Sequence, residues 1–328
     1  MAEVTTTLNI GALELEKAGI KLDTLKGEVA VVTGGASNIG LGYARSIAGA
    51  GGCVVIADMN EEAGVEVQRV INEENGRDCA LFVKTNITEA ADIDNLKAQA
   101  YAKFGKVDIL VNNAMNMRLN GKILESPVED LDMSYAISGR GVALAIKAFV
   151  PDMIERKHGI VTYSATQFHY APPMVGGTIY TAGKAAATSV VMSLANELNE
   201  KGPVSEVGVK VFCLCPAGVM RFDAARFARF AEASGTTPVA SDAPPPPKFD
   251  MSAFKFTTPE ENGAAMVFCL ERAEQLHGSG VIHNDVFKEM GYPFHDVKPV
   301  DVPGMSFKKL TDMELTMVFC YMGQGFGN

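Results

Sequence analysis

The sequence predicts one α/β domain built on a doubly wound parallel sheet, with helices on both faces. Three observations support this: short apolar runs recur along the chain, longer segments with helical spacing separate them, and a glycine-rich turn follows the first run. Short runs rich in Val, Ile, Leu and Phe are typical of strands buried on both faces of a parallel sheet. Their alternation with helices, through right-handed crossovers, predicts the doubly wound arrangement.

The elements follow this alternation in order. Six apolar runs are the predicted strands: 29–33, 53–57, 80–83, 107–111, 159–163 and 209–214. Helical spacing of apolar residues predicts the segments between them: 43–51 after the glycine-rich turn, then 63–74, 89–104, 128–155 and 182–199.

Three regions lie outside this alternation. Residues 1–26 form a predicted N-terminal arm with a weakly amphipathic helix around 13–19, before a domain at 27–288. The insertion 221–256 carries four consecutive prolines, which cannot join a helix or a central strand, so we expect a loop beside the substrate site, a packing insertion or a subunit contact. The extension 289–328 is rich in Met, Phe and Tyr near its end, which fits an oligomer interface or packing on its own subunit.

Composition and charge narrow the class of function. The chain has 328 residues, 47% of them hydrophobic, which is ordinary globular usage. Its formal net charge of −10 disfavours nucleic acid or an anionic membrane as partner. No apolar run approaches a membrane span, and the first residues lack the pattern of a signal peptide. The six cysteines include no CxxC pair and no zinc-ligand spacing. We therefore expect a cytoplasmic protein with a small-molecule substrate and no metal site.

A dinucleotide site is predicted where the first strand ends. That strand runs into Thr-Gly-Gly-Ala-Ser-Asn-Ile-Gly at 33–40, and backbone N–H groups in such a turn can approach a pyrophosphate at a helix N-terminus. The second strand ends at Asp58, 24 residues after Gly34. A carboxylate there can accept hydrogen bonds from ribose hydroxyls and would repel a 2′-phosphate, which favours NAD over NADP. The alternative is that Asp58 only caps a helix or stabilises a turn.

A candidate catalytic pair opens the helix after the fifth strand. Tyr180 and Lys184 are four residues apart, so their side chains share one helix face. An ammonium group beside a phenol lowers the phenol's pKa, and such a tyrosine can act as general acid or base toward an alcohol or carbonyl oxygen.

These motifs, together with Asn112-Asn113-Ala114 after the fourth strand, resemble the short-chain dehydrogenase/reductase family of classical type. The resemblance runs from about residue 26 to about residue 285. It implies a homodimeric or homotetrameric, NAD(H)-dependent oxidoreductase that interconverts a secondary alcohol and a ketone. Tyr180 would be the acid/base, and Lys184 would bind the nicotinamide ribose and lower the pKa of Tyr180.

The resemblance also implies the cofactor contacts. Residues of the turn would line the pyrophosphate and its ribose, Asp58 would hold the adenosine ribose, and the others would contact the adenine, the back of the cofactor and the carboxamide. The full set is Gly34, Ser37, Asn38, Ile39, Gly40, Asp58, Asn86, Ile87, Asn113, Ala114, Tyr180, Lys184 and Val219.

Three departures from the family pattern lie in the cofactor and relay positions. Asn38 replaces a glycine of the turn, and asparagine tolerates the left-handed conformations that glycine adopts. Ser138 replaces the asparagine that supports a proton relay, although its hydroxyl could still hold a water. Ala217 and Arg221 alter the segment that anchors the carboxamide.

The fourth departure concerns the serine that orients the substrate. Aligned on the fifth strand, this position falls on Ala165; counted back from Tyr180, it falls nearer Thr166 or Gln167. Neighbouring strand positions point to opposite faces, so one position matters. Ser164 is the first choice and Thr166 the second, and the third possibility is that no hydroxyl orients the substrate.

Apolar residues near the expected pocket suggest an apolar, cyclic or aromatic substrate: Met115, Met117, Phe168, Met174, Met220 and the phenylalanines of 222–230. The alternative function is a nucleotide-binding protein with weak or no catalysis, serving regulation or assembly. The altered serine and asparagine positions motivate it, and the retained Tyr180 and Lys184 argue against it.

Overall fold

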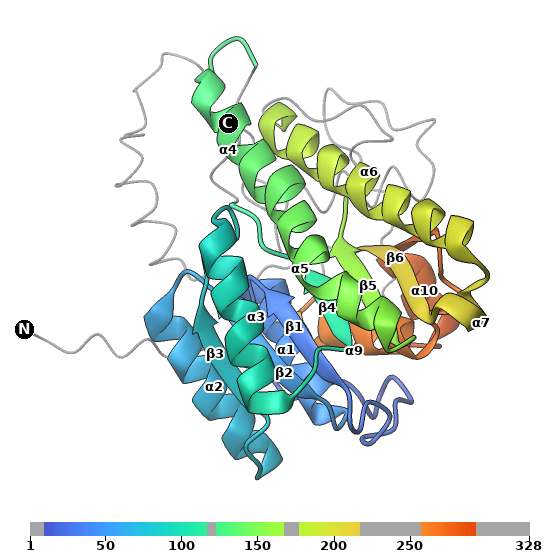
Figure 1. The fold of residues 1–328 in the computed structure, drawn as a ribbon. Coiled ribbons are helices and arrows are strands. Elements are labelled where there is room, and N and C mark those ends of the chain that lie inside the picture. Colours follow the sequence, from blue (N-terminus) through green and yellow to red (C-terminus); the bar gives the residue numbers. More distant parts are fainter. Residues whose placement is uncertain (1–9, 117–122, 167–176, 217–256, 293–328) are drawn as a thin grey trace, which may run out of the picture.

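The computed structural model describes residues 10–116, 123–166, 177–216 and 257–292. They form one seven-stranded parallel sheet in the order β3-β2-β1-β4-β5-β6-β7, which confirms the predicted doubly wound fold (Figure 1). The strands are β1 (Val29–Thr33), β2 (Cys53–Asp58), β3 (Ala80–Lys84), β4 (Ile109–Asn112), β5 (Gly159–Ser164), β6 (Val209–Cys215) and β7 (Ser279–Ile282). The first six agree with the apolar runs to within two residues at either end.

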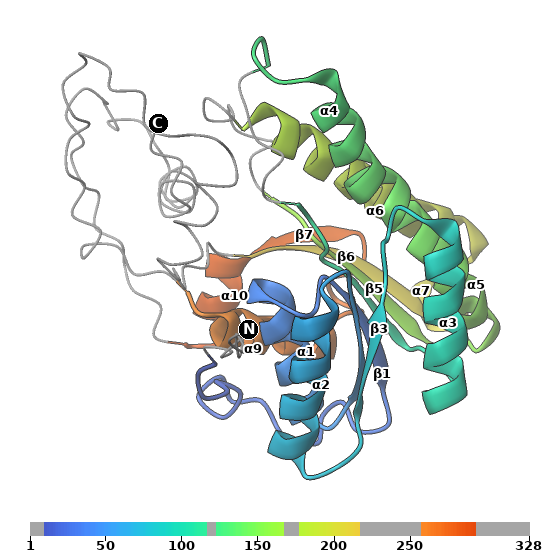
Figure 2. The same cartoon turned by 90° about the vertical axis from the view of Figure 1, so that its left-hand side faces the viewer.

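Helices cover both faces of this sheet. Helices α1 (Asn38–Gly49), α2 (Glu61–Asn75), α9 (Pro259–Glu271) and α10 (His283–Glu289) lie on one face. The opposite face carries α3 (Ala90–Phe104), α5 (Val142–Glu155) and α6 (Thr178–Lys201), while the short α7 (Val204–Val207) leads into β6 (Figure 2). Two buried apolar clusters, one on each face, form the core.

Two predicted helices differ from the structure. The segment 128–155 is divided into α4 (Val128–Tyr135), a π-helical turn η1 (Ala136–Gly141) and α5, because the wider turn interrupts the α-helical hydrogen bonds between α4 and α5. The helix expected around 13–19 is a series of turns instead.

The described part of the N-terminal arm packs into the core. Leu15 is 1% exposed, and Ile20 and Leu25 are buried in the same cluster as α1 and α9. The Gly11 amide donates to Glu260 at 2.8 Å, and the buried Arg45 donates to the Gly11 carbonyl at 2.9 Å. Backbone groups of the arm are therefore held by a buried ion pair of the domain.

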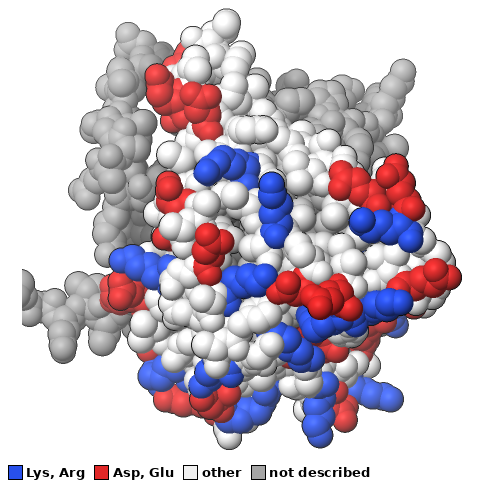
Figure 3. Space-filling model, in the orientation of Figure 1, with Lys and Arg blue, Asp and Glu red and all other residues white. Residues whose placement is uncertain are grey.

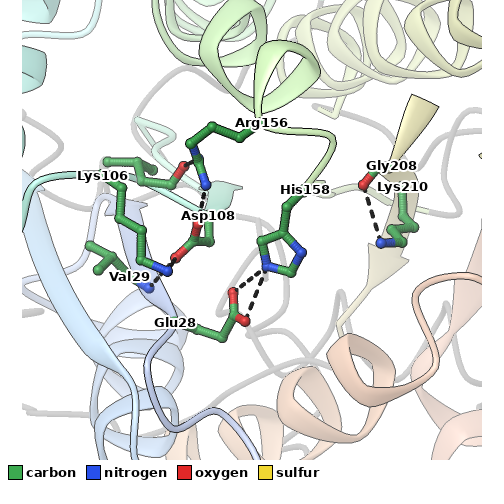
Figure 4. A network of polar contacts seen from close by, with 9 residues as sticks. Glu28, Val29, Lys106, Asp108, Arg156, His158, Gly208 and Lys210 are labelled. Carbon is green, nitrogen blue, oxygen red and sulfur yellow. Dashed lines mark hydrogen bonds and ion pairs between the residues drawn. The ribbon is translucent and has the colours of Figure 1, made fainter. Parts of the chain in front are cut away.

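A polar network joins the amino ends of several strands (Figure 4). Asp108 is fully buried and accepts from Arg156 at 2.6 Å, from Lys106 at 2.7 Å and from the first amide of β1 at 3.0 Å. Beside it, His158 Nε2 lies 2.9 Å from a carboxylate oxygen of Glu28. These groups lie at the amino ends of the strands. In folds of this kind ligands bind at the opposite edge of the sheet, beyond the carboxyl ends of the strands.

Charges are mixed over the face shown in Figure 3. Lysine and arginine side chains stand next to acidic ones over its lower half and over the C-terminal end of α6, and a white, uncharged area covers the N-terminal part of α6. No helix among the described residues is long and apolar enough to cross a membrane.

Candidate active site

The turn between β1 and α1 needs its glycines. Gly34 has φ +66°, and a Cβ there would lie 2.9 Å from the Ala114 Cα. A Cβ at Gly40 would lie 2.0 Å from the Gly34 carbonyl oxygen, so there is no room for any side chain at position 40. Asn38 has φ 46°, in the left-handed region expected for the residue that replaces glycine. The turn therefore brings backbone to backbone and places the first turn of α1 beside the carboxyl ends of β1 and β4.

Asp58 lies beside this turn. One carboxylate oxygen accepts from the Ala36 amide at 3.1 Å, and the other accepts from the Asn60 amide at 3.0 Å. The side chain that caps α2 is Asn60, which accepts from the Ala63 amide, so Asp58 does not cap that helix. Its contacts hold a carboxylate between the glycine-rich turn and the end of β2.

The next pair follows β3. The Asn86 side-chain oxygen accepts from the Thr88 amide at 3.1 Å and from its hydroxyl at 2.9 Å, so it stabilises the local turn. Ile87 is 8% exposed, and a Cβ at Gly141 would lie 3.0 Å from its carbonyl oxygen. This packing places the π-helical turn against the loop after β3.

Asn113 ties three strand ends together. Its side-chain amide donates to the Thr33 carbonyl at 3.1 Å, and its backbone amide donates to the Thr33 hydroxyl at 2.9 Å. Its side-chain oxygen accepts from the Ser164 hydroxyl at 3.0 Å. The Ala114 amide also donates to the Thr33 hydroxyl, at 3.1 Å. The carboxyl ends of β1, β4 and β5 are thereby held as one unit.

Tyr180 and Lys184 lie in the first two turns of α6. Lys184 is 4% exposed, and its Nζ donates to the Ser164 backbone carbonyl at 2.6 Å. The same Nζ lies 5.8 Å from the ring centre of Tyr180 and 4.8 Å from that of Tyr163. Burial lowers the pKa of Lys184 from 10.5 to about 8, so its charge is held in a poorly solvated place close to the phenol.

The candidate substrate-orienting residues at the end of β5 have different surroundings. Tyr163 and Ala165 belong to the apolar cluster on the side of α6, whereas the Ser164 hydroxyl is bonded to Asn113. It is the backbone of Ser164, not its hydroxyl, that meets Lys184. Thr166 is 7% exposed. Ser37 and Ile39 flank Asn38 at the start of α1, while Val219 lies outside the described residues, as does the insertion 221–256.

Sequence reasoning assigned no role to Tyr163, whose ring is the aromatic group nearer to the Lys184 ammonium. Burial raises the pKa of Tyr163 well above 10, and the Tyr180 phenol adds to this. The alternation along the fifth strand could have indicated this neighbour, because Tyr163 shares a face of the strand with Ala165.

These residues fit a nicotinamide dinucleotide. Such a cofactor needs three groups, and all are present. They are a glycine-lined turn in which backbone atoms occupy the space of any Cβ, the N-terminus of a helix, and a carboxylate at the end of the second strand. Near them, a phenol with a buried ammonium neighbour can exchange a proton with an oxygen atom.

Comparisons with known proteins agree with this geometry. The family model described as short chain dehydrogenase matches residues 28–228. Oxidoreductase UcpA of Salmonella typhimurium is 34% identical over 199 residues, which cover 60% of this chain and 70% of that protein. The 2,5-dichloro-2,5-cyclohexadiene-1,4-diol dehydrogenase LinX of Sphingobium indicum is 30% identical over 222 residues, which cover 67% of this chain and 78% of that protein.

Two solved structures are similar over about four fifths of the chain. L-Sorbose reductase from Gluconobacter frateurii, complexed with NADPH and L-sorbose, superposes with a TM-score of 0.66 at 25% identity, covering 80% of this chain and 96% of that one. A 7α-hydroxysteroid dehydrogenase, complexed with NADH and 7-oxo glycochenodeoxycholic acid, gives 0.64 at 25% identity, covering 79% and 94%. The chain therefore belongs to the short-chain dehydrogenase/reductase family of oxidoreductases.

Proposed function

We propose that this protein is an NAD(H)-dependent dehydrogenase/reductase that interconverts a secondary alcohol and a ketone. The observation that carries the proposal is the pair on α6, where a buried ammonium lies 5.8 Å from the ring centre of Tyr180. A charge in that place favours the phenolate form, so Tyr180 can give up or take a proton near neutral pH.

The two residues of the pair have different tasks in this proposal. The bound nicotinamide supplies the chemistry of hydride transfer. Tyr180 donates a proton from its hydroxyl to the carbonyl oxygen during reduction and takes it back during oxidation. Lys184 is fixed by its bond to the Ser164 carbonyl, stabilises the phenolate and binds the nicotinamide ribose. Ser164 and Thr166 remain the two candidate hydroxyls for orienting the substrate.

We propose NAD rather than NADP because of Asp58. The two similar solved structures contain NADPH and NADH respectively, so membership of the family leaves this choice open. The Asp58 carboxylate stands beside the glycine-rich turn, where it can accept from two ribose hydroxyls and would repel a 2′-phosphate. The turn residues Gly34, Ser37, Asn38, Ile39 and Gly40, with Asn86, Ile87, Asn113, Ala114 and Val219, complete the proposed cofactor contacts.

For the substrate we propose an apolar cyclic or aromatic ketone. Met115 is half-buried after β4, and its sulfur accepts from the Ser138 hydroxyl at 3.2 Å. Ser138 lies against α6, where a Cβ at Gly183 would be 3.2 Å from its hydroxyl. Methionine adapts to irregular apolar ligands. The named substrates of the relatives range from a sugar to a bile-acid derivative, so a panel must include both kinds.

We also propose a homo-oligomer. Apolar side chains are exposed on and just before α4: Leu124 is 96% exposed, Val128 69% and Tyr135 60%. A second copy packed against this surface would remove its apolar side chains from water. Light scattering tests the proposal by measuring the molar mass of the protein in solution.

The test combines cofactor binding with turnover. NADH and NADPH are titrated by fluorescence, and a panel of cyclic and aromatic ketones is screened for NADH oxidation, with sugars as the polar comparison. Tyr180→Phe should abolish turnover and leave the Kd for NADH nearly unchanged; unchanged turnover in this variant would exclude Tyr180 as the acid. Tight binding of NADH with no turnover on the whole panel would favour the alternative of a nucleotide-binding protein without catalysis.

A further inference from the structure

The Lys184 ammonium has an aromatic neighbour that the catalytic motif does not include. The ring of Tyr163, on β5, lies under its Nζ with 4.8 Å between the nitrogen and the ring centre, which is inside the range of cation–π attraction. The ring of Tyr180 is farther, at 5.8 Å. Tyr163 is 1% exposed, so water does not screen this contact.

Among the described residues, little else stabilises the charge of Lys184. The Ser164 carbonyl accepts from Nζ at 2.6 Å. The thiols of Cys213 and Cys215 on β6 are the other titratable neighbours, and burial raises the pKa of each to about 12, so both are neutral. No carboxylate among the described residues forms an ion pair with Lys184. One carbonyl and two aromatic rings therefore face this cation in the described part of the chain.

We propose that Tyr163 is a positioning residue whose ring face holds the Lys184 ammonium in its charged form beside Tyr180. The proposal rests on the proposed function insofar as the charged ammonium serves catalysis, but the contact itself is a property of the protein without cofactor. The attraction acts only on the protonated amine, so it raises the pKa of Lys184 above the value that burial alone would produce. Tyr163 would thereby extend the pH range over which Lys184 stays charged.

The ring and the hydroxyl of Tyr163 make different predictions. Its hydroxyl is buried and forms no hydrogen bond with any described residue, although Ser138 is close enough to lower the pKa of Tyr163. If the ring holds the ammonium, phenylalanine can replace Tyr163 without effect on Lys184. If the hydroxyl did so, phenylalanine would remove the effect entirely.

The experiment follows the titration of Lys184 directly. The full chain is labelled with ¹³C,¹⁵N-lysine, and the Lys184 resonance is assigned by its loss in Lys184→Arg. Tyr163→Phe is compared with variants that carry 3,5-difluoro- and 3,4,5-trifluorophenylalanine at position 163. Fluorine withdraws electron density from the ring face while nearly preserving its shape, so these variants change the attraction without opening a cavity. The resonance of Lys97, which lies 5.3 Å from the ring of Tyr101 on α3, serves as internal reference.

We expect the pKa of Lys184 to lie near 8 in the protein and in Tyr163→Phe, and to fall stepwise with fluorination by roughly 0.4 to 1.5 pH units in total. A pKa that does not change with fluorination, or one that falls fully in Tyr163→Phe, would overturn the proposal. The high-pH limb of turnover should move down with the Lys184 pKa. If the pKa moves and that limb does not, the contact with Tyr163 is supported and the catalytic role proposed for Lys184 is wrong.

Discussion

Replacing Lys184 with methionine should stabilise the protein while it removes activity. Burial lowers the pKa of Lys184 from 10.5 to about 8, which corresponds to ~3 kcal/mol of unfavourable free energy for the charged form in the folded state. Methionine has a similar length and no charge to bury. It leaves the Ser164 carbonyl without its donor, which costs about 1 kcal/mol. We therefore expect Lys184→Met to raise the free energy of unfolding by about 2 kcal/mol at pH 7.

The stability gained in Lys184→Met should depend on pH in a defined direction. The folded state binds the Lys184 proton less tightly than the unfolded state, so the cost of the charge is complete below about pH 8 and disappears as the pH rises toward 10.5. The stability advantage of Lys184→Met should therefore shrink between these two values. Urea unfolding of the protein without cofactor at pH 7, 8.5 and 10 measures it.

Lys97→Met is the matched control. Lys97 is 31% exposed and pairs with Asp152 at 2.7 Å, so its loss should cost no more than about 1 kcal/mol. The reasoning is refuted if Lys184→Met is less stable than the parent protein at pH 7, or if its advantage does not change with pH.

Three further substitutions, one of them with a matched control, test the packing and the cofactor site. Gly42→Ala would place a Cβ 1.7 Å from the Pro259 carbonyl oxygen and force α1 away from α9. We expect it to lower the free energy of unfolding by about 3 kcal/mol, measured by thermal unfolding. In the control Gly280→Ala the new Cβ meets no atom within 4 Å, so the free energy of unfolding should change little. Arg45→Met removes the arginine that pairs with the buried Glu260 carboxylate and should cost about 3–5 kcal/mol in urea unfolding. Asp58→Ala should raise the affinity for NADPH relative to NADH at least ~10-fold, measured as the ratio of the two Kd values, and an unchanged ratio would contradict the proposed role of Asp58.

The first six strands were predictable because apolar residues dominate each of them. The run at 53–57 becomes β2 with only Asp58 added, since strands covered by helices on both faces leave no place for polar alternation. The edge strand β7 has four residues and is only half-buried, and its sequence Ser-Gly-Val-Ile is not a comparable apolar run.

The π-helical turn was not predictable from the spacing. Residues 128–155 have one continuous helical pattern, and a single wider turn barely disturbs it. What decides the wider turn is contact: a Cβ at Gly141 would lie 3.0 Å from the Ile87 carbonyl, and Ser138 is buried against α6, where a Cβ at Gly183 would lie 3.2 Å from its hydroxyl. Such contacts join segments far apart in the sequence.

The sequence by itself determined the family fold, the glycine-rich turn, Asp58 and the order of Tyr180 and Lys184, because local spacing places these side chains relative to their own strand or helix. Only the tertiary structure decided what each side chain meets. Alternation along the fifth strand separates Ser164 from its neighbours, but it does not say that the Ser164 hydroxyl reaches Asn113 while its carbonyl reaches Lys184. The ring of Tyr163 lies nearer to that ammonium than the ring of Tyr180 does because α6 packs across β5, and the distance between two packed elements is set by the core between them.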